Sequence, residues 1–193
     1  LLSTGDNGYR IDNSLPARAL TRMKGGSARY AYVLGLTRTE SRLSMGVDGK
    51  MLVDAESGRE CLSPQIAVSL SYIPIVIYVG SEFVPDSCAY QEILAHEMRH
   101  LKTYLDYLPK VETRVRAALT KRFDGQILYA PVGQVKQQLE AEIDTAWMPY
   151  LKSEMAKVEA LQTAIDTPKE YARLSKVCKG EVQSLIGAAK RKR

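Results

Sequence analysis

Apolar and polar residues alternate along the first half of the chain, and this pattern is typical of half-buried β-strands. Residues 66–72 alternate cleanly, and residues 75–79 form a short apolar run. Asp48-Gly49, between apolar neighbours, is a dipeptide typical of a tight hairpin turn. The pattern therefore predicts a small, mainly antiparallel sheet over residues 29–80.

After about residue 86 the apolar residues recur every three to four positions, which is the period of an amphipathic helix. This period predicts a first long helix over residues 86–121, which Pro109 must kink or end. It also predicts further helices over residues 132–189, with a kink at Pro149. Residues 167–170, Thr-Pro-Lys-Glu, mark a helix start, with Thr at the N-cap and Pro at the first helical position.

The two ends of the chain have a different character from these patterned segments. Residues 1–28 are rich in Gly, Asn, Ser and Pro, and they predict an irregular segment around one short helix at residues 17–23. Residues 190–193 form a basic tail, Lys-Arg-Lys-Arg. Together the segments predict one α+β domain over residues 1–193, in which the sheet is followed by long helices.

Composition excludes several classes of protein. With 193 residues, 45% hydrophobic and 25% charged, the chain can bury a core as one domain. No apolar run approaches the roughly 20 residues that a membrane span needs. The net charge of +5 is spread along the sequence except for the tail, without interleaved aromatic and basic residues, so we expect no nucleic-acid partner.

The three cysteines, Cys61, Cys88 and Cys178, are widely spaced and form no C-x-x-C motif. A zinc site built on thiolates is therefore not expected, whereas one disulfide would fit an exported protein. The spacing does not choose which two cysteines pair. The chain also begins at Leu1 without a basic or apolar leader, so we expect a trimmed product of a bacterial cell, secreted or periplasmic.

His96-Glu97-Met98-Arg99-His100 is an H-E-x-x-H motif, and it contains the only two histidines of the chain. On a helix, residues four apart lie on one face, so both imidazoles can reach one metal ion. Glu97 lies on the apolar stripe of the predicted helix, where an unpaired carboxylate is costly. The sequence therefore predicts a metal site in which Glu97 faces a water molecule on the ion.

This motif, on a helix that follows a sheet, resembles the zincin metallopeptidases and small secreted bacterial proteins of unassigned function that carry it. The specific match covers His96, Glu97 and His100, with a looser match of layout over residues 30–165. The resemblance implies a zinc-dependent peptidase acting on peptides or proteins. It implies that His96 and His100 bind Zn, that Glu97 is the general base, and that residues 66–72 or 75–79 form the substrate-binding edge strand.

A third protein ligand is needed to complete such a site, and no further histidine exists to supply it. Glu154 lies near the centre of the apolar stripe of the second helical stretch, where an unpaired charge is costly. If the two long helices form an antiparallel hairpin about residues 122–131, residues near 98 face residues near 154. Geometry therefore favours Glu154 as the third metal ligand.

Motif analogy favours a different glutamate. Glu140 and Asp144 form an E-x-x-x-D pair like that of the thermolysin-type enzymes, or gluzincins, so Glu140 stays an alternative ligand. Three other carboxylates fit the position less well, because of their distance from His100 or a role in a helix cap: Asp106, Glu112 and Glu170.

Two further questions stay open. Tyr104 and Tyr107 follow the motif on the same helical side, where a phenol could stabilise an oxyanion, although such tyrosines are more often core residues with a polar tip. The missing third ligand keeps a rival function open: a non-catalytic zincin-like binding or envelope protein with a degenerate or metal-free site.

Overall fold

Two separate β-sheets carry the strands of this protein. The computed structural model describes residues 1–5, 8–26 and 32–191, and the chain divides into two compact units where we expected a single domain. The first unit consists of Leu1–Asp6, Ser41–Tyr72 and Asp106–Lys157. The second consists of Asn7–Glu40, Ile73–Leu105 and Val158–Arg193. The fold class is α+β, as predicted, and both sheets are mixed.

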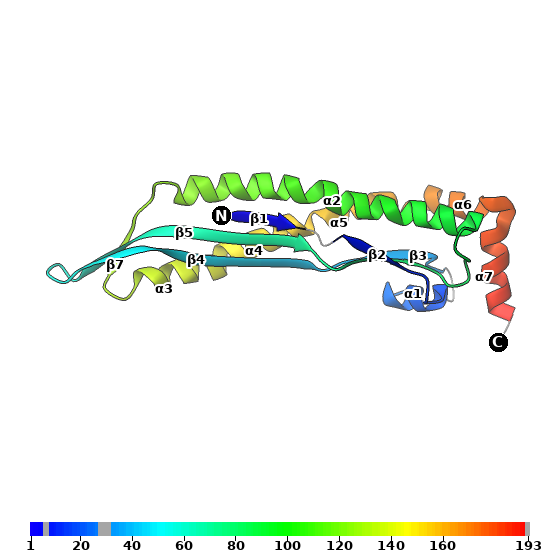
Figure 1. Cartoon of the computed structure of the whole chain (residues 1–193), viewed down its shortest axis with the longest axis horizontal. Helices are drawn as coiled ribbons and strands as arrows, with labels where there is room; N and C mark the ends of the chain where they lie inside the picture. Colours follow the sequence, from blue (N-terminus) through cyan, green and yellow to red (C-terminus); the bar gives the residue numbers. More distant parts are fainter. Residues whose placement is uncertain (6–7, 27–31, 192–193) are drawn as a thin grey trace. The chain divides into compact units, whose positions relative to one another are not determined.

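The sheet of the first unit is built around the long strand β5 (Arg59–Tyr72). β5 is antiparallel to β4 (Ser41–Asp54) and β7 (Leu128–Pro131) and parallel to β1 (Leu2–Gly5), as Figure 1 shows for β1, β5 and β4. Alternate residues of β5 are buried, among them Leu62, Val68 and Leu70. The predicted period of two is therefore that of a strand with one covered face.

The hairpin between β4 and β5 turns at residues 55–58, and not at Asp48-Gly49, where the sequence pattern places it. Gly49 lies inside β4, paired with Pro64, and a Cβ on it would lie 2.2 Å from the Ser63 carbonyl oxygen. The absence of a side chain at Gly49 therefore allows the two strands to approach each other closely. Asp54 stabilises the turn at residues 55–58, because its carboxylate accepts hydrogen bonds from the Glu56 N–H and the Ser57 hydroxyl.

Helices complete the core of the first unit. They are the second half of α2 (Cys88–Phe123), α3 (Val135–Glu142), a π-helical turn η1 (Ile143–Trp147) and α4 (Met148–Ala156). α2 continues past Pro109, where we expected a kink or an end. The irregularity expected at Pro149 falls just before it, in the π-helical turn η1, which joins α3 and α4 without a break. The packed residues are Leu62, Phe123, Ala130, Val135, Leu139 and Ile143.

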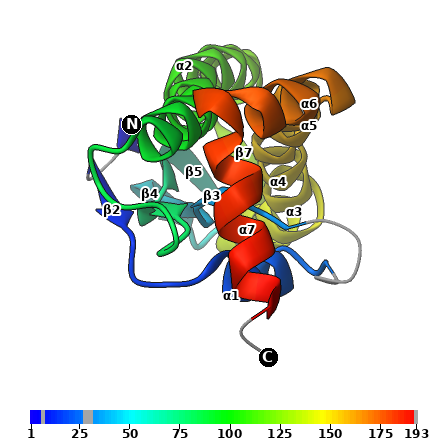
Figure 2. The same cartoon turned by 90° about the vertical axis from the view of Figure 1, so that its right-hand side faces the viewer.

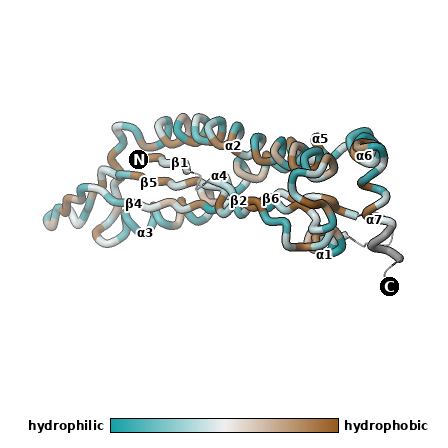
Figure 3. The backbone as a smooth tube through the Cα atoms, turned by 45° about the vertical axis from the view of Figure 1, so that its right-hand side comes forward, coloured by the Kyte–Doolittle hydropathy of each residue, from teal (hydrophilic) through white to brown (hydrophobic). Residues whose placement is uncertain are grey.

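The second unit has a three-stranded sheet with β6 (Ile75–Val79) in its centre. β6 is parallel to β2 (Tyr9–Asp12) and antiparallel to β3 (Gly35–Arg38). The sequence of β6, Ile-Val-Ile-Tyr-Val, explains its brown, hydrophobic colour in Figure 3. Ile77 and Val79 are fully buried, as expected for a strand with neighbours on both sides.

The helices of the second unit are α1 (Ala17–Met23), the first half of α2, α5 (Val158–Ile165), α6 (Pro168–Lys176) and α7 (Glu181–Arg191). Figure 2 shows α5 and α6 beside α2. The helix expected at residues 17–23 is confirmed, and α6 begins as predicted, because the Thr167 hydroxyl accepts a hydrogen bond from the Glu170 N–H. None of the helices that the structure describes is long and apolar enough to cross a bilayer.

The N-terminal stretch differs from the prediction. Residues 1–28 were expected to be irregular apart from one helix, yet β1 and β2 form parallel edge strands there. Their partners are more than 60 positions away, so no local pattern marks them. The start of the predicted sheet, residues 29–31, and the last two residues of the predicted basic tail, 192–193, lie outside the described residues.

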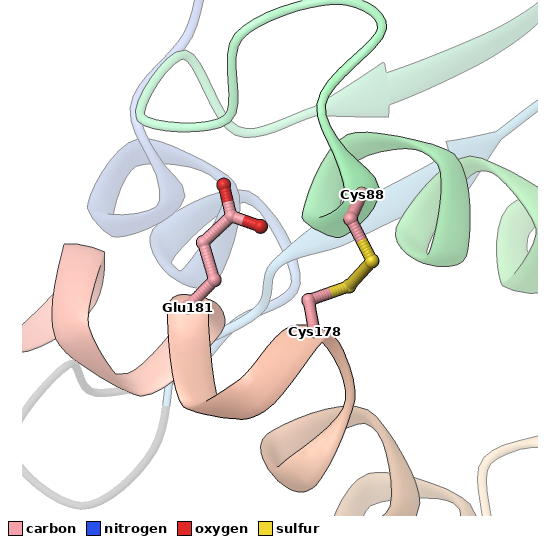
Figure 4. Close-up of side chains that lie close together, drawn as sticks. All are labelled: Cys88, Cys178 and Glu181. Atoms are coloured by element: carbon pink, nitrogen blue, oxygen red, sulfur yellow. A yellow bond between two sulfur atoms is a disulfide. The ribbon is translucent and has the colours of Figure 1, made fainter.

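One disulfide joins Cys88, the first residue of α2, to Cys178, which begins the 3₁₀ turn η2 (Cys178–Gly180). Figure 4 shows the bond beside Glu181, whose carboxylate accepts a hydrogen bond from the Ala89 N–H. Cys61 on β5 is a free thiol. The prediction of one disulfide is confirmed, and the structure supplies the pairing that the sequence leaves open.

Candidate metal centre

The helix α2 places the two histidines of the motif on one face of the second unit. Both side chains are buried, with 3% of His96 and 8% of His100 exposed. Their Nε2 atoms lie 3.3 Å apart. Two ring nitrogens at this distance need a proton or a cation between them, because two lone pairs at close range repel each other.

Asp166 follows α5 directly and supplies a third donor atom to the same point. Its Oδ1 lies 3.2 Å from His96 Nε2 and 3.1 Å from His100 Nε2. Zinc ligands that lie 2.0–2.2 Å from a tetrahedral ion are about 3.3 Å from one another, so the three donor atoms fit a zinc ion closely. Two imidazoles and one carboxylate are also a donor set that zinc commonly takes in catalytic sites.

The second oxygen of Asp166 holds the carboxylate in place. Oδ2 lies 2.6 Å from Lys24 Nζ, so the two oxygens of one carboxylate face different partners. Burial by itself raises the pKa of Asp166, but hydrogen bonds with His100, His96 and Lys24 outweigh it and hold the pKa well below its usual range. The carboxylate is therefore ionised at neutral pH.

The orientation of His100 is fixed by Gln162 on α5. His100 Nδ1 lies 2.6 Å from the Gln162 amide oxygen, and the amide nitrogen donates to the His100 carbonyl oxygen at 3.1 Å. An amide oxygen only accepts, so Nδ1 carries a proton, and in the neutral imidazole Nε2 keeps its lone pair toward the cluster. This is the tautomer that metal binding through Nε2 requires.

His96 has a charged partner at its other ring nitrogen. His96 Nδ1 lies 3.3 Å from Glu170 Oε1 and 2.8 Å from Arg99 Nη2. Hydrogen bonds from Arg173 and Arg99 outweigh burial and lower the pKa of Glu170 to about 2, so Glu170 is an acceptor. As placed, Arg99 Nη2 donates to Nδ1, so Nε2 carries the proton. Metal binding through Nε2 would require Nδ1 to donate to Glu170 instead, a carboxylate–histidine pair typical of zinc sites.

Glu97 lies beside the cluster and is not one of its donors. Only 4% of its surface is exposed, and its Oε2 accepts a hydrogen bond from the Thr37 hydroxyl at 2.9 Å. Burial raises the pKa of Glu97. β3 approaches this side chain so closely that a Cβ on Gly35 would lie 2.8 Å from Glu97 Oε1. The predicted burial of Glu97 is confirmed, and Thr37 is its hydrogen-bond partner.

A cavity of about 480 Å³ opens onto these groups. One wall is the backbone stretch 33–37, which includes the start of β3, and the opposite walls come from α2, α5 and α6. β3 is a terminal strand of its three-stranded sheet and borders this cavity. The edge strand expected at residues 75–79 is instead the central strand β6, and residues 66–72 belong to β5, which is paired on both sides.

The structure does not bring Glu154 to the histidines. Glu154 lies in the first unit, where its Oε2 accepts a hydrogen bond from Arg114 Nε at 2.6 Å and its Oε1 contacts Lys157. Its burial, with 5% exposed, is as expected, but two cations balance its charge. The alternative ligand, Glu140, is exposed on α3 and lies 3.9 Å from Lys136. Among the described residues, the carboxylate that joins the histidines is Asp166.

The register of the helices explains this difference. His100 contacts Gln162 and His96 contacts Asp166, so the antiparallel pairing is real but shifted by about ten residues from the expected one. Part of the shift comes from β7, which lengthens the connection, so that α3 begins at Val135. No local pattern marks Asp166, which directly precedes the predicted N-cap Thr167.

The two tyrosines after the motif have different surroundings. Tyr104 lines the cavity, with its hydroxyl 3.5 Å from Glu159 Oε1. The Tyr107 hydroxyl lies in the first unit and donates to the Glu154 carbonyl oxygen. A third tyrosine, Tyr171 on α6, lines the cavity beside His96, with ring centroids 6.3 Å apart. Sequence reasoning missed Tyr171, because nothing local distinguishes it from a core residue.

No protein-family model, curated protein or solved structure matches this chain. What can be inferred about function therefore rests on the geometry of His96, His100 and Asp166.

Proposed function

We propose that this protein is a zinc-dependent peptidase, with His96, His100 and Asp166 as zinc ligands and Glu97 as general base. The observation that carries the proposal is the spacing of the three donor atoms, 3.1 to 3.3 Å from one another. Zinc, when bound there, would act as a Lewis acid that lowers the pKa of water to about 7 and polarises a carbonyl group.

Glu97 has the properties of a proton carrier. A buried carboxylate with a raised pKa can take a proton from the attacking water and pass it to the leaving amine. The Thr37 hydroxyl donates to Oε2 and fixes the orientation of the carboxylate. Because Glu97 is not among the donor atoms of the cluster, its carboxyl oxygens are available for this proton transfer.

The substrate would be a peptide or protein segment in extended conformation. The edge of β3 beside the cavity offers backbone N–H and C=O groups for pairing with such a chain. The disulfide is typical of proteins from oxidising compartments and supports a secreted or periplasmic location.

One observation favours a second candidate, a non-catalytic binding protein with a metal-free site. If His100 is protonated on both ring nitrogens, Asp166 accepts from both histidines and from Lys24, so hydrogen bonds alone can satisfy the cluster. In that case His96 Nε2 carries a proton and Nδ1 accepts from Arg99. The two candidates differ in metal content.

The test measures zinc and activity in the same samples. Purified protein is expected to hold about one zinc per chain by elemental analysis after dialysis, and to hydrolyse unstructured protein such as casein. Glu97→Gln is expected to keep the zinc and lose nearly all hydrolysis. Failure to take up micromolar zinc at neutral pH would refute the metal centre, and loss of zinc in Glu97→Gln would contradict the role of base.

A further inference from the structure

The cavity contains one acidic side chain that is remote from the three donor atoms. Glu159 lies in the first turn of α5, and its residue is exposed. Its nearest polar partner is the Tyr104 hydroxyl at 3.5 Å. Burial and the negative charge of Glu159 raise the pKa of Tyr104 to about 12, so the phenol stays neutral. Tyr104 therefore adds no negative charge beside the Glu159 carboxylate.

The position of Glu159 along the cavity follows from the helices that carry it and its partner. Tyr104 comes one helical turn after His100, a rise of about 6 Å along α2. Glu159 comes one turn before Gln162, which contacts His100. An extended peptide advances about 3.3 Å per residue. A substrate side chain one or two positions from the bond at the metal centre can therefore reach Glu159.

The charges of the cavity are unevenly balanced. Lys24, the cation that lines it, is paired with Asp166. Within the part of the chain that the structure describes, the Glu159 carboxylate forms no ion pair. A cationic group that enters beside Glu159 would gain an attraction that a neutral or acidic group would not.

We propose that Glu159 selects peptides that carry a lysine or arginine next to the bond that is cleaved. This inference rests on the proposed peptidase function and specifies its substrate class. Glu159 acts on specificity alone, because it contacts neither the histidines, nor Asp166, nor Glu97 among the interactions of the described residues.

The experiment uses the zinc-loaded full chain. Cleavage sites are first mapped by mass spectrometry on digested casein, and matched fluorogenic peptides are then made with Lys, Ala or Glu at each position flanking the preferred site. The ratio of kcat/KM for the Lys and Glu peptides is measured for the native protein, Glu159→Gln and Glu159→Lys. Glu140→Lys is the control, because it makes the same charge change on an exposed residue that does not line the cavity.

We expect the native protein to prefer Lys over Glu at one flanking position. Glu159→Gln should lower that ratio about fivefold, in line with one partly exposed charge pair, and Glu159→Lys should reverse it. Glu140→Lys should leave the ratio unchanged. A ratio that Glu159→Lys does not move would overturn the inference and leave the peptidase intact, whereas absence of any cleavage by zinc-loaded protein would overturn the proposed function and this inference with it.

Discussion

At the scale of single residues, the two carboxylate oxygens of Asp166 have different partners. Oδ1 faces the histidines and Oδ2 faces Lys24. Glu154 is more deeply buried and is neutralised by Arg114 and Lys157 in the other unit. The two carboxylates therefore differ in their partners, which are two histidines and one lysine for Asp166 and two cations for Glu154.

Replacement of Asp166 should therefore abolish tight zinc binding. For Asp166→Ala we expect zinc affinity to fall by more than the roughly 10–100-fold that loss of an outer-shell partner costs. Glu154→Ala should leave zinc affinity unchanged. Titration with a competing chelator measures both. The reverse ranking would return the role of third ligand to Glu154.

Gly35 makes a second prediction at this scale. A methyl group there would meet Glu97 and Ile93 at 2.8 Å, so Gly35→Ala should cost about 1–3 kcal/mol of stability and displace the carboxylate of Glu97. We expect activity to fall while zinc stays bound. Gly46→Ala is the matched control, since a Cβ there meets nothing within 4 Å. Equal unfolding midpoints for the two variants would contradict the close approach of β3.

At the scale of elements, the features that depend on nearby residues were predicted correctly, and the pairings between distant segments were not. The helix at residues 17–23 and the start of α6 follow from nearby residues, and the H-E-x-x-H motif placed His96, Glu97 and His100 on one helix. The parallel strands β1 and β2, and the contact of Asp166 with the histidines, depend on partners more than 60 positions away. A short strand has too few residues to show a clear alternation of apolar and polar positions. An error in the length of a connection changes which residues of two paired helices face each other.

The disulfide between α2 and η2 gives the prediction that belongs to this scale. Cys178→Ser should destabilise the second unit by about 2–4 kcal/mol, because the bond closes a segment of 90 positions in the unfolded chain. Cys61→Ser removes a free thiol and should change little. Thermal unfolding, with and without reductant, compares them: reductant should lower the native midpoint to that of Cys178→Ser. A native midpoint that reductant leaves unchanged would be inconsistent with the bond.

At the scale of the whole molecule, ionised carboxylates with cationic or hydrogen-bonding partners occur in both units. Hydrogen bonds lower the pKa of each of these groups below its usual value: Glu112, Glu142, Glu154, Asp166 and Glu170. A carboxyl whose pKa is lower in the folded state stabilises the fold above its unfolded pKa, near 4, and this contribution is lost as the pH falls further.

We therefore expect these carboxyls to make stability fall below about pH 4. Urea unfolding of metal-free protein at pH 7, 5 and 3 measures this trend. Glu154→Gln should cost about 1–2 kcal/mol at pH 7, where it removes a charge-assisted hydrogen bond to Arg114, and almost nothing at pH 3. A cost that is the same at both values of pH would show that the charge of Glu154 contributes nothing.

The disulfide has one more consequence, for the covalent integrity of the centre. Cys88 and Cys178 bracket every proposed ligand in the sequence, so His96, His100 and Asp166 lie in one closed ring of chain. A single cut between residues 100 and 166 would leave the ligands on two polypeptides that stay joined through the sulfur atoms. Nicked protein would then run as one species without reductant and as two with it, and would keep its zinc until the bond is reduced.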